Sequence, residues 1–236
     1  MFDLINPSRV FSWIQKLINF INSIFFVVLM IALTFALIIS PPDYLQSDSV
    51  RIMYVHVPSA WIALASFTAI AFFSVLSFIF KIKNLNLISK SIAPIGLLFT
   101  FLAIITGSLW GQPTWGTWWV WDARITSMVV LSFFYIILIV IHKLIEDEDK
   151  AYKAASIVAI IGSINIPIIK YSVDWWNTLH QPQSINLLKG TSSIHSSMLL
   201  PLMLMLLVLL LYCALIFLMK YKTEIIRIKK KNIKRL

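Results

Sequence analysis

Six long stretches of this 236-residue chain contain no charged residue. One charged side chain near the centre of a membrane-spanning helix costs about 2.5–3.5 kcal/mol, whereas each Leu or Ile returns only about 0.3–0.6 kcal/mol. Most of the six stretches reach the roughly 17–25 residues that a spanning helix needs. The chain is therefore predicted to be an all-α polytopic membrane protein, a single membrane domain with six transmembrane helices. The predicted helices cover about Ile18–Ser40, Pro58–Phe80, Ser91–Trp110, Ile125–Ile141, Ala154–Ile169 and Met198–Met219.

The basic residues give the expected orientation of these helices. An even number of spans places both termini on one side of the membrane. Sixteen of the 20 Lys and Arg residues fall in the terminal segments and in the connections after the second and fourth helices. By the positive-inside rule, both termini are predicted to be cytoplasmic. The net charge of +10 follows mostly from this bias and does not indicate nucleic-acid binding. The outer side keeps only Arg51, Arg124, Lys170 and Lys189.

Several classes of function are excluded by what the sequence lacks. The single cysteine, Cys213, lies inside an apolar stretch and cannot form a disulfide or a thiol relay within the chain. No Walker A sequence is present, so an ATP-driven step would need another subunit. The first apolar stretch is too long for a signal peptide and is expected to be retained. We expect a protein that binds and transfers a ligand, and not an enzyme.

A loop rich in tryptophan, Trp110–Thr126, is the clearest functional signal. It reads W-G-Q-P-T-W-G-T-W-W-V-W-D-A-R-I-T and holds five of the nine tryptophans of the chain. An interfacial aromatic belt would scatter these residues along helix ends, whereas this loop concentrates them. Such a dense group favours a surface for a large, flat, apolar partner such as a porphyrin. If the loop is partly helical, Trp115, Trp118 and Trp119 are expected to share one face.

Two histidines are candidate metal ligands on the same outer side. His56 lies in Y-V-H-V-P just before the second predicted helix, with Pro58 in the first turn of that helix. His180 lies in W-W-N-T-L-H-Q, beside a second tryptophan pair. Two neutral imidazoles suit the axial positions of a haem iron. A structural zinc would need four ligands, which this region does not supply. His142 and His195 are more simply explained as ordinary polar side chains.

Other polar residues of the outer side have two explanations each. Asp122 is placed to cap the fourth helix, or to orient a ligand or Arg124. Arg124 and Arg51 are cations that could pair with haem propionates or anchor the chain at the membrane surface. Gly111 and Gly116 allow close approach of the backbone to a ligand. The role of Lys170 is open.

The string W-G-T-W-W-V-W-D-A-R-I-T resembles the WWD signature of haem-handling proteins. With Y-V-H-V-P and W-W-N-T-L-H-Q at its flanks, it resembles specifically the cytochrome c maturation protein C (CcmC, haem exporter protein C) family. The resemblance covers about Tyr44–Gln181 and implies a non-covalent haem b with His56 and His180 as its axial ligands. It also implies a WWD platform formed by residues within Trp115–Asp122, namely Trp115, Gly116, Trp118, Trp119, Trp121 and Asp122.

The resemblance further implies the partners and the cellular place of the chain. The family presents haem to a membrane-anchored haem chaperone of the CcmE type. It works beside an ABC-type ATPase, a second membrane subunit and a small single-span protein. This implies a bacterial inner membrane with the haem site facing the periplasm, and an organellar inner membrane is the other possibility.

Haem delivery for cytochrome c biogenesis is therefore the favoured hypothesis. The alternative is a permease subunit that carries haem or another substrate across the membrane. Ionisable groups inside the membrane would mark such a pathway. The six stretches carry almost none, since they contain no charged residue, although Pro94, Gly96, Gly107, Gly162 and Pro167 interrupt them. A haem-based electron carrier would need a second redox centre.

Overall fold

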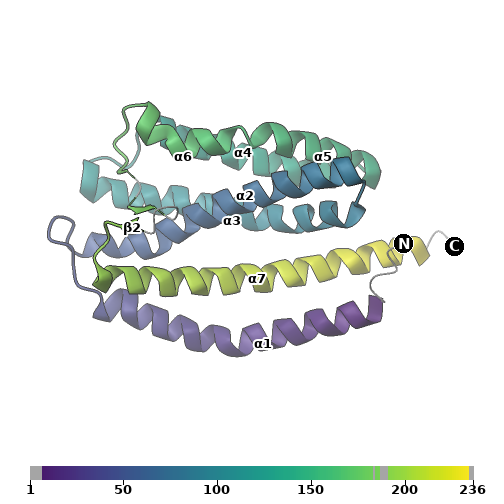
Figure 1. Ribbon diagram of the computed structural model, residues 1–236, viewed down its shortest axis with the longest axis horizontal. Helices are drawn as coiled ribbons and strands as arrows, with labels where there is room; N and C mark the ends of the chain where they lie inside the picture. The colour runs from purple at the N-terminus through teal and green to yellow at the C-terminus, as the bar shows by residue number, and fades with distance from the viewer. Residues whose placement is uncertain (1–6, 183, 187–190, 234–236) are drawn as a thin grey trace.

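The computed structural model describes residues 7–182, 184–186 and 191–233 and shows a bundle of long helices (Figure 1). Within the described residues, six helical segments are long and apolar enough to cross a membrane, and α5 and α6 together form one of them. The elements are α1 (Pro7–Thr34), the π-helical turn η1 (Phe35–Ile39), the 3-10 turn η2 (Asp48–Ile52), α2 (Met53–Phe80), α3 (Lys83–Trp115), α4 (Ala123–Leu144), α5 (Glu148–Gly162), α6 (Asn165–Trp175), the paired strands β1 (Ile185–Asn186) and β2 (Thr191–Ser192), and α7 (Ser196–Ile233).

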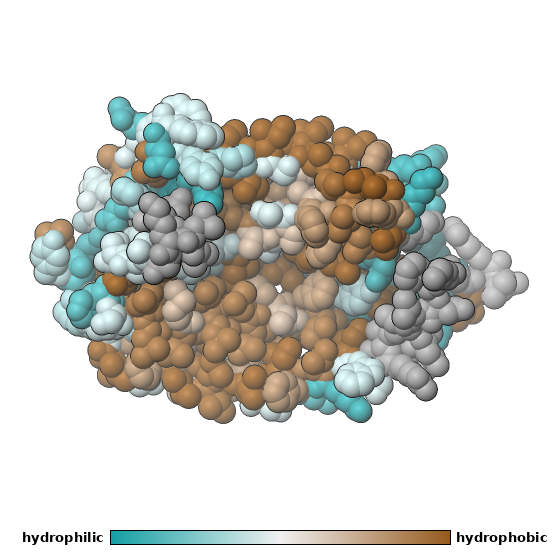
Figure 2. Space-filling model, in the orientation of Figure 1, coloured by the Kyte–Doolittle hydropathy of each residue, from teal (hydrophilic) through white to brown (hydrophobic). Residues whose placement is uncertain are grey.

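The helix α1 begins, and α7 ends, at the same end of the bundle (Figure 1). We call this the terminal end, and the opposite end the loop end. A broad apolar belt covers the middle of the molecule, and hydrophilic residues gather at both ends (Figure 2). This distribution is that of a protein whose middle faces lipid. The cytoplasmic location of the terminal end stays a prediction, and Lys189, one of the four basic residues expected outside, lies outside the described residues.

The helices α2 to α6 pack around one core, and α1 lies beside α7 along the edge of this group (Figure 1). Phe67, Phe99, Leu131 and Tyr135 are fully buried in that core. The Tyr135 hydroxyl donates a hydrogen bond to the Ala63 carbonyl oxygen at 2.7 Å. Lipid tails are as apolar as these side chains, so close packing and hydrogen bonds between helices stabilise the bundle.

The fifth span is broken between α5 and α6, at Ser163 and Ile164. Pro167 explains the break, because it donates no backbone hydrogen bond to Ser163 and its ring crowds that carbonyl group. Just after the break, the buried Asn165 side-chain amide donates to the Ser127 carbonyl oxygen of α4 at 2.8 Å. This bond fixes α6, and the segment that follows it, relative to α4.

Three helices extend at least five residues further toward the loop end than the charge-free stretches suggest: α2, α3 and also α6, which ends at Trp175 and not at Ile169. The helix α2 begins at Met53 and not at Pro58, so His56 lies in the first turn of the helix and Pro58 in the second. The reason is that Met53 and Tyr54 are buried in a cluster with α1 and α7, which favours helix before the proline. The helix α3 continues to Trp115, so the first part of the tryptophan-rich loop is helical.

Gly96 offers a test of this packing. A Cβ atom at position 96 would overlap the Tyr135 ring. Gly96→Ala is therefore expected to lower the stability of the bundle by about 1–3 kcal/mol or more, the usual cost of overpacking a core. Thermal unfolding of the detergent-purified protein measures the effect. The double variant Gly96→Ala/Tyr135→Leu has room for the new methyl group and is expected to melt at a higher temperature than Gly96→Ala; a lower melting temperature would contradict this account.

Candidate functional site

Two imidazoles and two indoles meet at the loop end of the bundle. His56 of α2 and His180, which follows α6, have ring centroids 6.4 Å apart and ring planes inclined by 35°. Trp110 of α3 contacts His56 edge to face, with centroids 5.7 Å apart. Trp115, the last residue of α3, has its ring centroid 6.1 Å from that of His180. Three separate segments therefore bring both candidate ligands together.

The His56 ring is positioned by α3. A Cβ atom at Gly107 would lie 2.9 Å from His56 Cε1, so the absence of a side chain there makes room for the imidazole. The Thr106 hydroxyl lies 3.1 Å from His56 Nδ1 and donates its own hydrogen to the Leu102 carbonyl oxygen at 2.5 Å. Thr106 must then accept a hydrogen bond from Nδ1–H. This assigns the proton of the neutral ring to Nδ1 and leaves the lone pair of Nε2 available to a metal.

His180 has two competing partners for the same ring nitrogen. Its Nδ1 lies 2.9 Å from Arg124 Nη1 and 2.9 Å from the Gln181 carbonyl oxygen. A guanidinium only donates, so the Arg124 bond requires the lone pair at Nδ1 and the proton at Nε2. The Gln181 bond requires Nδ1–H and leaves Nε2 free to bind a metal. The two bonds therefore belong to two different tautomers of His180. Only the tautomer that donates from Nδ1 to Gln181 can bind a metal through Nε2.

Burial, and next the charge of Arg124, lower the pKa of His180 from 6.5 to about 4, while the hydrogen bond to Gln181 opposes this shift. The neutral imidazole is therefore the form present at neutral pH. Arg124 is itself held in place, because its guanidinium also donates to the carbonyl oxygens of Ile169 and Lys170 at 3.3–3.4 Å.

The rest of the tryptophan-rich loop is irregular and partly exposed. Gly116 ends α3 with φ of 74°, and its N–H donates to the Gln112 carbonyl oxygen at 3.0 Å. A Cβ atom there would meet nothing, so this glycine serves the left-handed turn. Trp118 and Trp121 are 59% and 71% exposed. Because the helix stops at Trp115, the expected sharing of one helical face by Trp115, Trp118 and Trp119 is wrong.

The Trp119 ring packs edge to face against the exposed Trp121 ring, with centroids 5.2 Å apart. The Trp119 indole Nε1 is buried and has no hydrogen-bond partner. Asp122 caps α4, since its Oδ1 accepts from the Ile125 N–H at 2.8 Å, while its buried Oδ2 has no partner. The loop thus contains one buried donor, Trp119 Nε1, and one buried acceptor, Asp122 Oδ2, without a hydrogen-bond partner.

Other residues singled out in the sequence lie outside this group. Arg51 donates to Asp48 at 3.0 Å and to the Ala36 carbonyl oxygen at 2.9 Å, and no contact joins it to either imidazole within the described residues. His195 is exposed and pairs with the Ser197 hydroxyl at 2.8 Å. Lys170 lies over the Tyr171 ring, 5.4 Å from its centroid. His142 lies in the last turn of α4, near the terminal end.

The supporting roles of three residues were not identified from the sequence. Thr106 and Gly107 precede Trp110 by four and three residues on α3, a helical spacing that could have pointed to the same face. Gln46 accepts a hydrogen bond from the Trp110 indole N–H at 2.8 Å and so ties the first outer loop to the site. No pattern in the sequence pairs a loop glutamine with a tryptophan 64 residues away.

Comparison with known proteins identifies relatives along most of the chain. Residues 1–235 match the sequence profile of the heme exporter protein C (CcmC) family. "Heme exporter protein C" of Bradyrhizobium diazoefficiens is 38% identical over 227 residues, which cover 96% of this chain and 86% of that protein. "Heme exporter protein C" of Haemophilus influenzae is 40% identical over 201 residues, 85% of this chain and 81% of the relative. A "putative cytochrome c biosynthesis ccmC-like mitochondrial protein" of Marchantia polymorpha is 48% identical over 166 residues, 70% and 69% of the two chains.

The ionisation of His180 tests the role of Arg124. The Arg124→Gln variant loses one of the two causes of the low pKa, so the pKa of His180 is expected to rise above about 4 while burial keeps it below 6.5. Nuclear magnetic resonance of the ¹⁵N-histidine-labelled, ligand-free protein measures this pKa, with His180→Gln assigning the signal. Arg51→Gln removes an equal charge away from the ring and is the matched control; an equal rise in that variant would contradict a specific effect of Arg124.

Proposed function

Because this chain belongs to the heme exporter protein C (CcmC) family, we propose that it binds haem b non-covalently at the loop end, between His56 and His180, and delivers it to a haem chaperone for cytochrome c biogenesis. The haem is cargo that the chain holds and releases. The observation that carries this proposal is the convergence of the two imidazoles beside an exposed tryptophan loop.

The spacing and chemistry of the two rings fit a haem iron. Imidazole nitrogens bind metals at about 2 Å, so two rings on opposite sides of one metal have centres roughly 6–7 Å apart. The observed distance between the centroids is 6.4 Å. No group of three or more His, Cys, Asp or Glu residues that could hold a metal occurs in the described part of the chain. Two ligands suffice for haem, because the porphyrin supplies the other four nitrogens.

The two ligands differ in how firmly they are held, and this difference suits transfer. His56 is fixed by Thr106 and Gly107 in the tautomer that binds a metal through Nε2. His180 binds through Nε2 only when its ring leaves Arg124 and donates to the Gln181 carbonyl oxygen. Arg124 therefore competes with the iron for His180, which weakens one axial bond. A ligand that can be withdrawn in this way lets an acceptor take the haem.

The exposed indoles give the haem a surface for presentation. Trp118 and Trp121 are the most exposed rings of the loop, and aromatic faces stack well on a porphyrin or on a partner that approaches it. The other residues of the loop support these two rings. Trp115 ends α3, and Gly116 forms the turn that follows it. Trp119 packs against Trp121, and Asp122 caps α4. Arg124, and Arg51 on η2, remain candidate partners of the haem propionates.

The positive-inside rule supports an outward, periplasmic loop end in a bacterial inner membrane, with the organellar inner membrane as the alternative location. The resemblance of the loop to the WWD signature supports the partners: a CcmE-type chaperone, an ABC-type ATPase, further membrane subunits and a small single-span protein. An acceptor on the outer side would meet the exposed tryptophans directly.

The other candidate function is a permease subunit that moves haem or another substrate through the bundle. The break between α5 and α6 is the observation that favours it, because interrupted helices are typical of transport sites. Haem flux into vesicles that contain this protein alone decides between the two. Unassisted flux above that of empty vesicles would establish the permease, and none is expected for a delivery protein.

The two axial ligands are tested by visible spectroscopy of the purified protein. Wild type is expected to carry haem with the spectrum of a six-coordinate, bis-imidazole iron. His56→Ala and His180→Ala are each expected to shift the Soret band and reduce haem retention by about tenfold or more, because each removes one iron ligand. His195→Ala is the matched control, since this histidine is exposed and is not part of the pair. An unchanged Soret band in both ligand variants would contradict the assignment.

The presentation surface is tested by the rate of transfer. The Trp118→Ala/Trp121→Ala variant is expected to keep its axial ligands and its bis-imidazole spectrum but to pass haem to the purified chaperone several-fold more slowly, since stacking on one aromatic face is worth about 0.5–1.5 kcal/mol. Trp13→Ala, which alters an equally exposed indole at the terminal end, is the control. Equal transfer rates in the double variant and in wild type would remove these two rings from the handover.

A further inference from the structure

A second polar recess lies at the terminal end, opposite the imidazole pair. It encloses about 250 Å³ where α3, α4, α5 and α7 come together. Its walls include the cations Lys90, Lys143, Arg227 and Lys231, and also His142 and Tyr152. None of these residues takes part in the site at the loop end.

The charges of this recess are incompletely balanced. Four cations and only two carboxylates, Glu146 and Glu148, line it. Glu148 lies 3.4 Å from Lys231 and 3.7 Å from Arg227, so it is shared between two cations at long range. Glu224, which is not part of the lining, lies 2.7 Å from Lys90 and 3.2 Å from Arg227, so three carboxylates in all are set against the four cations. Lys143 makes no ion pair within the described part of the chain. The recess therefore has a surplus of positive charge.

Two further polar side chains, Tyr152 and His142, line the recess. Tyr152 is 7% exposed, and neither its hydroxyl nor the His142 ring nitrogens has a hydrogen-bond partner among the described residues. The two rings meet edge to face, with centroids 5.6 Å apart. These atoms are not among the fully buried unpaired ones of the described residues, so they stay open to water or to a ligand.

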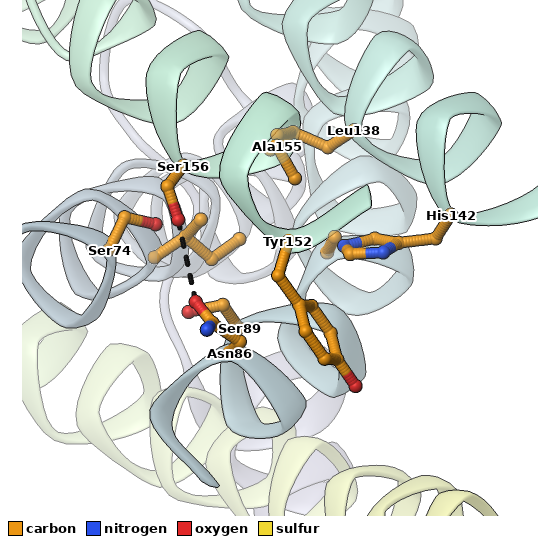
Figure 3. Close-up of a pocket in the computed structure, with 10 residues that line it drawn as sticks. Ser74, Asn86, Ser89, Leu138, His142, Tyr152, Ala155 and Ser156 are labelled. Atoms are coloured by element: carbon orange, nitrogen blue, oxygen red, sulfur yellow. Dashed lines mark hydrogen bonds between the residues drawn. The ribbon is translucent and has the colours of Figure 1, made fainter. Parts of the chain in front are cut away.

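A much smaller cavity continues behind these two rings (Figure 3). It has about 10 Å³, enough for roughly one water molecule. The buried Ser89 hydroxyl lines it without a partner, while Ser156 is turned toward Asn86, at 3.4 Å (Figure 3). The inner cavity thus holds a water at most, and any larger ligand must lie in the outer recess.

We propose that this recess binds the phosphate headgroup of an anionic phospholipid. Basic pockets between transmembrane helices are suited to such headgroups. The volume of about 250 Å³ is below the roughly 300–1,000 Å³ of pockets that enclose a drug-sized molecule. A headgroup fits, and the acyl chains would follow the apolar belt that begins next to the hydrophilic terminal end (Figure 2). The lipid source is preferred to a soluble phosphate because the recess residues Lys143, Glu148 and Lys231 lie at the ends of three spanning segments.

The headgroup would also join two parts of the bundle. The helix α7 packs mainly against α1, α2 and α3, and it reaches the corner of α4 and α5 through its bridges to Glu148. A phosphate that accepts from Tyr152, Lys143 and Arg227 would link these elements with charge-assisted hydrogen bonds. The lipid would then brace the terminal end, independently of haem at the loop end.

The full-length protein in nanodiscs of equal parts phosphatidylglycerol and phosphatidylcholine provides the test. Native mass spectrometry counts the phosphatidylglycerol that stays bound. Lys143→Gln/Arg227→Gln is expected to lower its retention at least about fivefold, the effect of removing one basic contact with an anionic surface. Lys153→Gln/Lys220→Gln makes the same charge change with two exposed lysines of the terminal end outside the recess, and is expected to change retention less than about twofold.

Tyr152→Phe removes one uncharged donor and is expected to lower retention without changing net charge. Equal retention in the recess variants and the lysine control would overturn the proposal, because the lipid would then be held by general surface charge. Displacement of the lipid by millimolar inorganic phosphate would overturn the lipid source. The Soret band of each variant reports haem binding separately, so a failure at the loop end is distinguishable from a failure here.

Discussion

The packing of α2 against α3 is the constraint on which the rest of the structure depends. Gly107 lets the His56 ring lie against α3, and Thr106 then fixes its tautomer. Farther along the same helix, Gly96 makes room for the Tyr135 ring, whose hydroxyl bonds to α2 through the Ala63 carbonyl oxygen. A bulkier residue at Gly107 would push α3 away from α2, and one at Gly96 would push α3 away from α4. The candidate ligand His56 and the core of the bundle thus both rely on close approach to glycines of α3.

The second candidate ligand is positioned by a different and looser set of contacts. His180 follows the broken fifth span, and its place depends on Asn165, which ties α6 to α4, and on Arg124, which holds the carbonyl oxygens of Ile169 and Lys170. Arg124 therefore stabilises the segment and opposes the metal-binding tautomer of the ring at its end. A single guanidinium would thus couple the order of this segment to the strength of the axial bond proposed for His180.

The sequence predicts the membrane architecture well, because charge in a membrane is costly over long stretches and the signal adds up over about 20 residues. The six spans within the described residues confirm it. Helix ends are less predictable, since the burial of Met53 and Tyr54 extends α2 past Pro58, and burial depends on helices far away in the sequence. The two histidines could be singled out from their aromatic flanks. The contacts that set their tautomers could not, because Thr106 and Arg124 act across 50 and 56 residues of chain.

The asymmetry between the two histidines bears on the order of release. His56 would keep its protein contacts when a metal binds Nε2, because its Nδ1–H donates to the Thr106 hydroxyl in either state. His180 must give up its Arg124 bond, a charge-assisted contact that is stronger than the neutral bond to Gln181 that replaces it. In the proposed haem site, the free energy of a His180–iron bond would be reduced by that difference, whereas that of a His56–iron bond would not. An incoming ligand from an acceptor would therefore meet the weaker resistance on the His180 side, next to Trp115 and the exposed tryptophan loop. The iron would pass to the acceptor with His56 as the last ligand to leave.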